Sequence, residues 1–226
     1  MKTKLLFSIC CALFLLNCTS KKNTDEFISN ASGRYFFNAD EVIEVVFKDK
    51  ELYLNWRNSD LKPLKVNDSI FYVRELNEKL IFNTKKHKII LAEKREHKGE
   101  KFTFLKLKKG EKTPSEYLED NNYELALNGY KEIQERDSLN PIIKERNLNR
   151  TGYRYLNNDE IEKAINVFKI NTELYPTSSN TFDSLGDAYL KSNDTIKAID
   201  SYKKALSINP ENRSSMRNLK KLTDEK

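Results

Sequence analysis

The spacing of apolar residues changes near residue 110 of this 226-residue chain. Before that point, short runs rich in β-branched and aromatic residues are separated by polar breaks such as Asn67-Asp68 and Asn83-Thr84. This is the pattern of antiparallel strands. After Pro114, apolar residues recur every three or four positions, as they do on one face of an amphipathic helix. The pattern therefore predicts an α+β chain with two domains, a β domain at residues 31–110 and a helical domain at residues 114–226.

The β domain must fit many strands into a short segment. Seven or eight strands between residues 31 and 110 predict a small antiparallel β-barrel or sandwich. Barrels of this size are usually filled by their own side chains. A cavity for a ligand is therefore an alternative and not the first expectation.

The helical domain is internally repetitive, with a period of about 34 residues. Its small residues and prolines recur in equivalent places, and aromatic residues recur with them. The pairs are Leu148 and Phe182, Gly152 and Gly186, Tyr155 and Tyr189, Ala164 and Ala198, Phe168 and Tyr202, and Pro176 and Pro210. This order resembles the tetratricopeptide repeat, a stacked helix-turn-helix unit. Small residues lie where two helices touch, aromatic residues fill the gap between units, and proline ends a helix. Two ordinary helical hairpins with a chance spacing are the alternative.

The repeat spacing divides the helical domain. A partial first unit covers residues 115–140, with its second helix at residues 123–136. Two full units cover residues 145–178 and 179–212, and a cap helix covers residues 213–224. So few units are close to the minimum for an independent stack.

The N-terminal segment has the features of a targeting signal. Lys2 and Lys4 precede an apolar run from Leu5 to Leu16, which is too short to span a bilayer. The run ends at Cys18 and resembles a bacterial lipoprotein cleavage box, although Asn17 stands where a smaller residue is usual. We therefore expect a signal peptide at residues 1–17, an acylated Cys18 and a flexible tether at residues 18–30. An ordinary secretory signal is the alternative.

The remaining composition limits the chemistry. All three cysteines lie at or before residue 18, so the rest of the chain has no disulfide. The net charge is +6, and residues 85–112 hold eleven Lys or Arg against four Glu. This basic run suits a solvated hairpin or an anionic lipid surface, and no nucleic-acid motif accompanies it. His87 and His97 are expected to face solvent, and no cofactor or metal is expected.

One longer segment, Phe168 to Tyr189, resembles the C-terminal repeat tail of bacterial serine hydrolases of the β-lactamase and penicillin-binding type. The β domain, which opens Gly33-Arg34-Tyr35, is similar to the small β domain that precedes that tail. The resemblance implies a protein of the bacterial cell envelope, in the outer membrane or on the periplasmic face, from a Bacteroidetes-like bacterium. The hydrolase domain itself is absent.

Catalysis is not expected. The nucleophile motif of those hydrolases is Ser-x-x-Lys. Ser59-Asp-Leu-Lys62 lies in a strand-rich stretch before Pro63, and Ser201-Tyr-Lys-Lys204 lies inside a repeat helix. No Lys-Thr-Gly accompanies either of them.

The repeat resemblance implies a binding surface on the first helix of each unit. Its positions here, which we call the first-helix surface, are Arg146, Asn149, Tyr153, Asn180, Asp183 and Asp187. This surface is expected to bind a peptide segment of another envelope protein. Two aspartates would repel a carboxylate, which favours a basic or neutral ligand. The alternative is structural, with Arg146 and Arg150 paired to Asp183 and with Asn171 bonded across the junction between units.

The sequence thus predicts a membrane-anchored lipoprotein that binds proteins and is not an enzyme. One rival is an accessory subunit of an envelope serine hydrolase. Another is a small-molecule or lipid carrier that uses the β domain. The sequence does not predict an oligomeric state.

Overall fold

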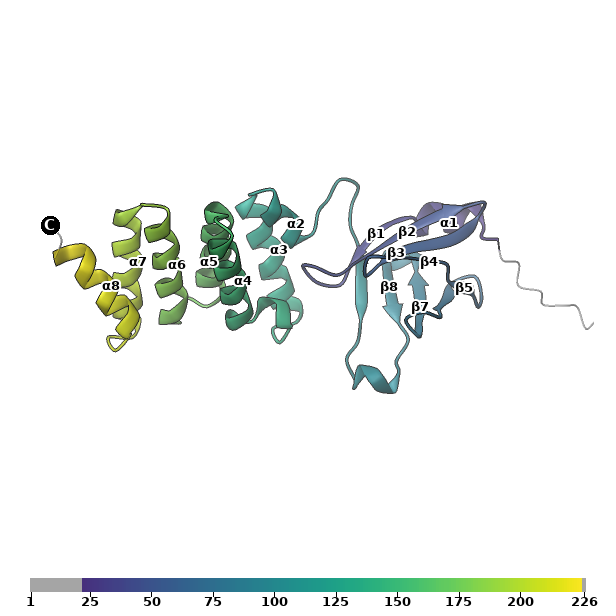
Figure 1. Cartoon of the computed structure of the whole chain (residues 1–226). Coiled ribbons are helices and arrows are strands. Elements are labelled where there is room, and N and C mark those ends of the chain that lie inside the picture. The colour runs from purple at the N-terminus through teal and green to yellow at the C-terminus, as the bar shows by residue number, and fades with distance from the viewer. Residues whose placement is uncertain (1–21, 225–226) are drawn as a thin grey trace, which may run out of the picture. The chain divides into compact units, whose positions relative to one another are not determined.

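The computed structural model describes residues 22–224, which form two compact units (Figure 1). One unit, the β unit, holds the described residues up to Tyr35 together with Ile43–Lys106. The other, the helical unit, holds Phe36–Val42 and the residues from Leu107 onward. The predicted signal peptide and Cys18 lie outside the described residues.

The β unit is built on one nine-stranded sheet. Its strands are β1 Gly33–Phe36, β2 Val42–Lys48, β3 Glu51–Trp56, β4 Ser59–Leu61, β5 Leu64–Lys65, β6 Ile70–Val73, β7 Glu78–Asn83, β8 Lys88–Leu91 and β9 Thr103–Lys106. The order is β4-β3-β2-β1-β9-β8-β7-β6-β5, so β1 to β4 and β5 to β9 each follow the sequence, and β9 pairs with β1. The pairs from β2 to β4 and from β5 to β9 are antiparallel.

The predicted small barrel or sandwich takes the form of a single curled antiparallel sheet. The two edge strands of its hydrogen-bonding order are β4 and β5. Only Lys62 and Pro63 separate these strands in sequence, so the chain itself joins the two edges. Proline has no N–H for a strand ladder. Two short strands, β4 and β5, therefore flank Pro63, and the described sheet has nine strands instead of seven or eight.

The concave side of the sheet is filled by large side chains. Along β3, Leu52, Leu54 and Trp56 are buried at every second position, as a strand with one covered face requires. The Trp56 ring meets Phe104 of β9 edge to face, with 5.8 Å between ring centroids. The expectation that side chains occupy the interior therefore agrees with the packing.

The predicted tether is corrected for residues 25–30, because Asp25–Ala31 form helix α1. Thr24 caps this helix by accepting a hydrogen bond from the Phe27 N–H at 3.1 Å. The Phe27 ring packs on three aromatic residues of the sheet, Phe47, Phe71 and Phe82, with centroids 5.5–6.0 Å away. Ala31 at the end of α1 is also fully buried. The helix is too short for its periodicity to be seen in the sequence.

The helical unit is a stack of consecutive helical hairpins (Figure 1). The helices are α2 Pro114–Glu119, α3 Tyr123–Arg136, α4 Glu145–Asn157, α5 Ile161–Leu174, α6 Ser179–Lys191, α7 Thr195–Ile208 and α8 Arg213–Asp224. Short 3-10 helices η1 Thr84–Lys86, η2 Arg95–His97 and η3 Pro141–Ile143 lie in loops of the two units. α3 has the bounds that its apolar pattern predicts, and α8 follows the second full unit as the expected cap.

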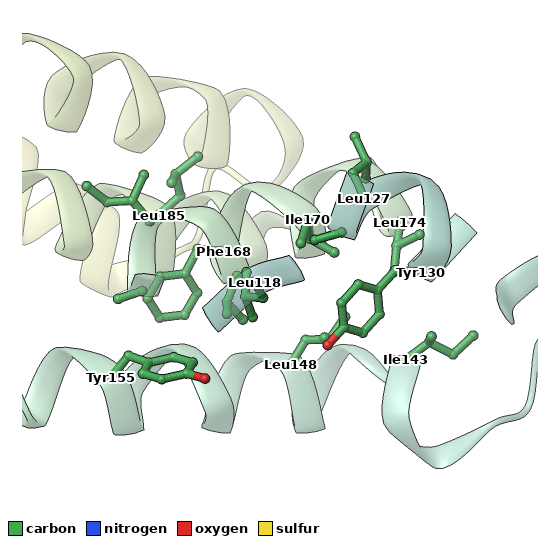
Figure 2. Packing of buried hydrophobic residues seen from close by; sticks show 14 of the residues in the cluster. Leu118, Leu127, Tyr130, Ile143, Leu148, Tyr155, Phe168, Ile170, Leu174 and Leu185 are labelled. Carbon is green, nitrogen blue, oxygen red and sulfur yellow. The ribbon is translucent and has the colours of Figure 1, made fainter. Parts of the chain in front are cut away.

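A continuous apolar core joins α2 through α6. Figure 2 shows Phe168 of α5 above Tyr155 of α4, with Leu118 of α2 beside them. Ala164 and Ala198 are fully buried, as expected for small residues between helices. Pro176 and Pro210 follow the last residues of α5 and α7.

The loop between β1 and β2 belongs to the helical unit by its contacts. Ala39 is fully buried in the helical core cluster. Arg136 of α3 donates a hydrogen bond to the Phe37 carbonyl at 2.7 Å, and Ser115 bonds the Asp40 carboxylate. The predicted domain boundary is therefore corrected, because residues 36–42 pack with a part of the chain that begins only at Leu107. The local pattern of residues 36–42 contains no sign of this.

We expect Gly152→Ala to lower the free energy of unfolding by about 1–3 kcal/mol, because overpacking a close helix contact forces side chains off their rotamers. A Cβ at Gly152 would lie 2.5 Å from the Phe168 ring. Chemical denaturation monitored by circular dichroism measures the loss. The double variant Gly152→Ala/Phe168→Leu should recover part of the loss in a double-mutant cycle, and additive losses would contradict the contact.

Candidate functional site

The first-helix surface lies on α4 and α6. Arg146 and Asn180 are exposed, Asn149, Tyr153 and Asp187 are partly buried, and Asp183 is only 7% exposed. The six positions thus divide into residues that face solvent and residues that the protein covers. Their hydrogen bonds show the same division.

Asp183 is covered by the cap helix. Ser215 of α8 is fully buried and donates its hydroxyl to the Asp183 carboxylate at 2.5 Å. Burial raises the pKa of Asp183 above its ordinary value, and the nearby Asp187 acts in the same direction. The hydrogen bond from Ser215 opposes this pKa shift because it stabilises the charged form. Asp183 therefore links α6 to α8.

Asp187 accepts hydrogen bonds from three helices. Tyr153 of α4 donates to Oδ2 at 2.7 Å, and Tyr202 of α7 donates to Oδ1 at 2.7 Å. Asn218 of α8 donates to the same Oδ1 at 3.2 Å. Burial raises the pKa values of both tyrosines, which keeps them protonated as donors. Because Tyr153 and Asp187 are separated by one repeat period, their bond joins equivalent positions of successive units.

The expected role of the two aspartates is therefore corrected. Both carboxylates hold helices together, so they are not available to set the charge of a ligand. The structural alternative is right in part. Asn171 donates to the Glu145 carbonyl at 3.2 Å across the junction between units. Neither arginine pairs with Asp183. Arg150 donates to Asn147 at 3.3 Å, and Arg146 has no hydrogen bond or ion pair within residues 22–224.

Two guanidinium groups of α4 remain available, one on the first-helix surface and one a helical turn further along. Arg146 and Arg150 are exposed. The Asn149 side chain has a buried Oδ1 with no hydrogen-bond partner among the described atoms. Asn180 of α6 donates a hydrogen bond to the Glu145 carboxylate at 3.0 Å, so this acid next to Arg146 already has a partner. The two arginines offer cationic donors, which are groups that recognise carboxylates.

The β unit contains a polar cluster that the sequence did not predict. Glu78 is buried and accepts from Lys94 at 2.5 Å and from His97 at 3.2 Å. The His97 side chain is only 8% exposed and packs on Phe102, so the expectation that it faces solvent was wrong. His87 is exposed, as expected. The approach of Glu78 to His97 is set by β7 and the β8–β9 loop, which are not close in sequence.

The remaining candidates for chemistry are placed as follows. Ser59 lies on the edge strand β4, and Ser201 in α7 donates its hydroxyl to the Lys197 carbonyl at 2.8 Å. In the described part of the chain, no three His, Cys, Asp or Glu side chains gather as metal ligands would. No helix between residues 22 and 224 has the length and apolar character needed to cross a membrane.

Comparison with known proteins identifies the repeat. Residues 180–212, which span α6, α7 and the turn after them, match the tetratricopeptide repeat family. The chain therefore contains a tetratricopeptide repeat, and that prediction is confirmed. No curated protein sequence matches the chain.

Several solved structures of tetratricopeptide repeat domains resemble half of the chain. The first repeat domain of human RPAP3 is 17% identical, with 49% of this chain and 84% of that chain covered at a TM-score of 0.35. The first repeat domain of Spaghetti (RPAP3) bound to an HSP90 peptide is 15% identical, with 50% and 86% covered at 0.35. The Sgt2 domain from Aspergillus fumigatus is 19% identical, with 50% and 73% covered at 0.36.

We expect Asp183→Asn to stabilise the protein at neutral pH, because it removes a buried charge and keeps an acceptor for Ser215. A carboxyl whose pKa is raised on folding stabilises the folded state when protonated, and this contribution is lost as the pH rises through its folded pKa. The advantage of the variant over the parent should therefore shrink as the pH falls from 7 toward about 4. Thermal unfolding across this range measures it. Asp200→Asn, at an exposed position of α7, is the control and should show no such trend.

Proposed function

We propose that the helical unit binds a peptide segment of another protein across the first-helix surface and has no catalytic activity. The tetratricopeptide repeat at residues 180–212 supports an interaction role, because such repeats build extended binding surfaces. The proposal rests on one observation, namely which polar groups of this surface already have partners within the protein and which do not. Asp183 and Asp187 are engaged by neighbouring helices, whereas the exposed guanidinium groups of Arg146 and Arg150 have donors left for a ligand.

The charge of the proposed ligand differs from the one expected from the sequence. Once the two aspartates are engaged internally, the exposed charges of α4 that remain on this surface are those of Arg146 and Arg150. Arg217, also exposed, stands at the equivalent of Asp183 one repeat later on α8. The carboxylates of an acidic segment can replace their bound water with charge-assisted hydrogen bonds to these guanidinium groups. We therefore propose an acidic peptide segment as the ligand.

The test is crosslinking of the tagged protein in its native cells, followed by identification of captured partners. The variant Arg146→Glu/Arg150→Glu should lose the partner, because each exposed guanidinium is replaced by a carboxylate that repels an acidic segment. With a synthetic peptide from that partner, the Kd should rise at least about tenfold, since hydrogen bonds to charged groups contribute about 1.5–3 kcal/mol each.

The matched control is Lys203→Glu/Lys204→Glu, which makes the same charge change at exposed positions of α7. This control should bind as the parent does. A partner lost equally by both variants would show that net charge alone matters, and a partner kept by both would place the binding elsewhere. Charge reversal at Asp183 and Asp187 is not a suitable test, because it would break the contacts between helices.

We also propose that the protein is anchored to a bacterial envelope membrane through an acylated Cys18. The support is the sequence alone, namely the basic start, the apolar run from Leu5 to Leu16 and the cysteine after it. Two or more acyl chains would hold the protein stably, because each buried CH₂ contributes about 0.8 kcal/mol. A serine hydrolase among the captured partners would favour the rival role of an accessory subunit.

The anchor predicts a membrane-bound parent and a released variant. Cys18→Ala should move the protein from the membrane fraction to the soluble fraction, because no acylation site remains. Mass spectrometry of the parent should show an N-terminal peptide that begins at Cys18 and carries fatty acyl mass. An uncleaved chain, or cleavage at another residue without added mass, would contradict the lipoprotein assignment and support an ordinary signal.

A further inference from the structure

We infer that the end of the β unit that carries α1 is a docking surface for anionic lipid head groups. The basic run at residues 85–112 looks like one patch in the sequence, but the sheet divides it between two ends. The turn after β7 lies at one end, and the β8–β9 loop lies at the other. The two ends differ in their balance of charge.

The α1 end is assembled from segments that are far apart in the sequence. The Asn23 N–H donates to the Lys50 carbonyl at 2.8 Å, which places the β2–β3 turn beside the start of α1. Lys106 donates to the Asn30 carbonyl at 2.7 Å, and its own N–H bonds the His87 carbonyl at 2.9 Å. The β2–β3 turn, the β7–β8 turn and the end of β9 therefore surround α1.

This arrangement gathers cations, which we call the basic rim. Its residues are Lys48, Lys50, Lys85, Lys86, Lys88 and Lys106. Within the described residues, Lys85, Lys86 and Lys88 have no ion pair, and the first two are exposed. The acids at this end are fewer, and one of them, Asp25, pairs with Lys50 at 2.9 Å.

The opposite end of the sheet is nearly balanced. In its β8–β9 loop, Arg95, Lys98 and Lys101 alternate with Glu93, Glu96 and Glu100. Lys94 is engaged by the buried Glu78. The excess of unpaired positive charge in the described β unit is therefore concentrated around α1.

The position of the chain's described start favours a membrane as the occupant. Lys22 is the first described residue, and Lys65 beside the rim donates to its carbonyl at 2.9 Å. The apolar run and Cys18 precede this point in the sequence. A chain held at Cys18 would bring the basic rim within a few residues of the lipid surface, where each Lys contributes about 1 kcal/mol and salt screens the attraction. The inference builds on the proposed membrane location, but it concerns the folded surface and not the acyl chains.

The test uses the full chain with Cys18→Ser, so that no acyl anchor contributes. Binding is measured by co-sedimentation with vesicles of phosphatidylcholine alone and with vesicles that also contain phosphatidylglycerol. We expect tighter binding to the anionic vesicles, and this preference should fall as salt is raised. Binding to the neutral vesicles measures the contribution of the apolar run, which all variants share.

Two matched variants locate the surface. Lys85→Glu/Lys86→Glu/Lys88→Glu should weaken binding to anionic vesicles by at least about a hundredfold, because three cations are lost. Arg74→Glu/Lys79→Glu/Lys101→Glu makes the same change at exposed positions of the opposite end and should keep the preference almost unchanged. Circular dichroism of both variants checks that they are folded.

The other outcomes overturn the inference. Equal losses in the two variants would show that net charge alone drives binding, and equal binding to both vesicle types would leave no role for the rim. Stronger binding to a DNA duplex than to anionic vesicles would assign the rim to nucleic acid. If the rim does not bind anionic vesicles but the protein from cells is acylated, this inference fails and the proposed anchor stands. If the rim binds anionic vesicles but the protein from cells is not acylated, the proposed anchor fails and this inference stands.

Discussion

The helical unit depends on the contact between a glycine on the first helix of each repeat and an aromatic ring on the second. Phe168 lies against Gly152 and Tyr202 lies against Gly186, so closely that a Cβ on either glycine would come within 2.6 Å of the ring. This contact fixes the distance between paired helices because protein interiors are close-packed and adjust little. It also fixes how far one first helix lies from the next. Tyr153 can therefore reach Asp187 in the following unit.

The polar network on the inner helices follows from that spacing. Asp187 meets hydroxyls from the preceding first helix and from its own second helix, and α8 supplies Asn218. A cap helix that only covered apolar surface would leave Asp183 and Asp187 partly buried with fewer donors, which is costly. Ser215 and Asn218 supply the missing ones. The cap is therefore part of the polar structure of the stack as well as its end.

The sequence predicted those parts of the structure that a local pattern specifies. The glycine, alanine and aromatic positions of α4 to α7 follow directly from the repeat period, and most of the strands follow from runs of β-branched and aromatic residues. Helix α1 could not be predicted, because its contacts are distant in sequence. Phe27 packs on Phe47, Phe71 and Phe82 of the sheet, for example. The packing of residues 36–42 with the helices also depends on contacts distant in sequence. For Asp183, a local pattern does not distinguish a ligand from Ser215, which lies one helical hairpin later.

Several acidic side chains form hydrogen bonds or ion pairs within the protein, and this makes parts of its surface more positive. Asp183 and Asp187 bond hydroxyl and amide groups, Glu78 is buried beside Lys94, and Glu119 accepts from Tyr155 and Lys163 at 2.5 Å. Within residues 22–224, several cations have no such partners, among them Arg146 of α4 and Lys85 and Lys86 of the β7–β8 turn. A formal net charge of +6 therefore understates how positive the accessible surface is at these two places. The field at a surface depends on which charges remain unpaired and exposed, and this is the physical reason for proposing anionic ligands for both units. The β unit presents its cations around the described start of the chain, and the helical unit presents them on the first helix of a repeat.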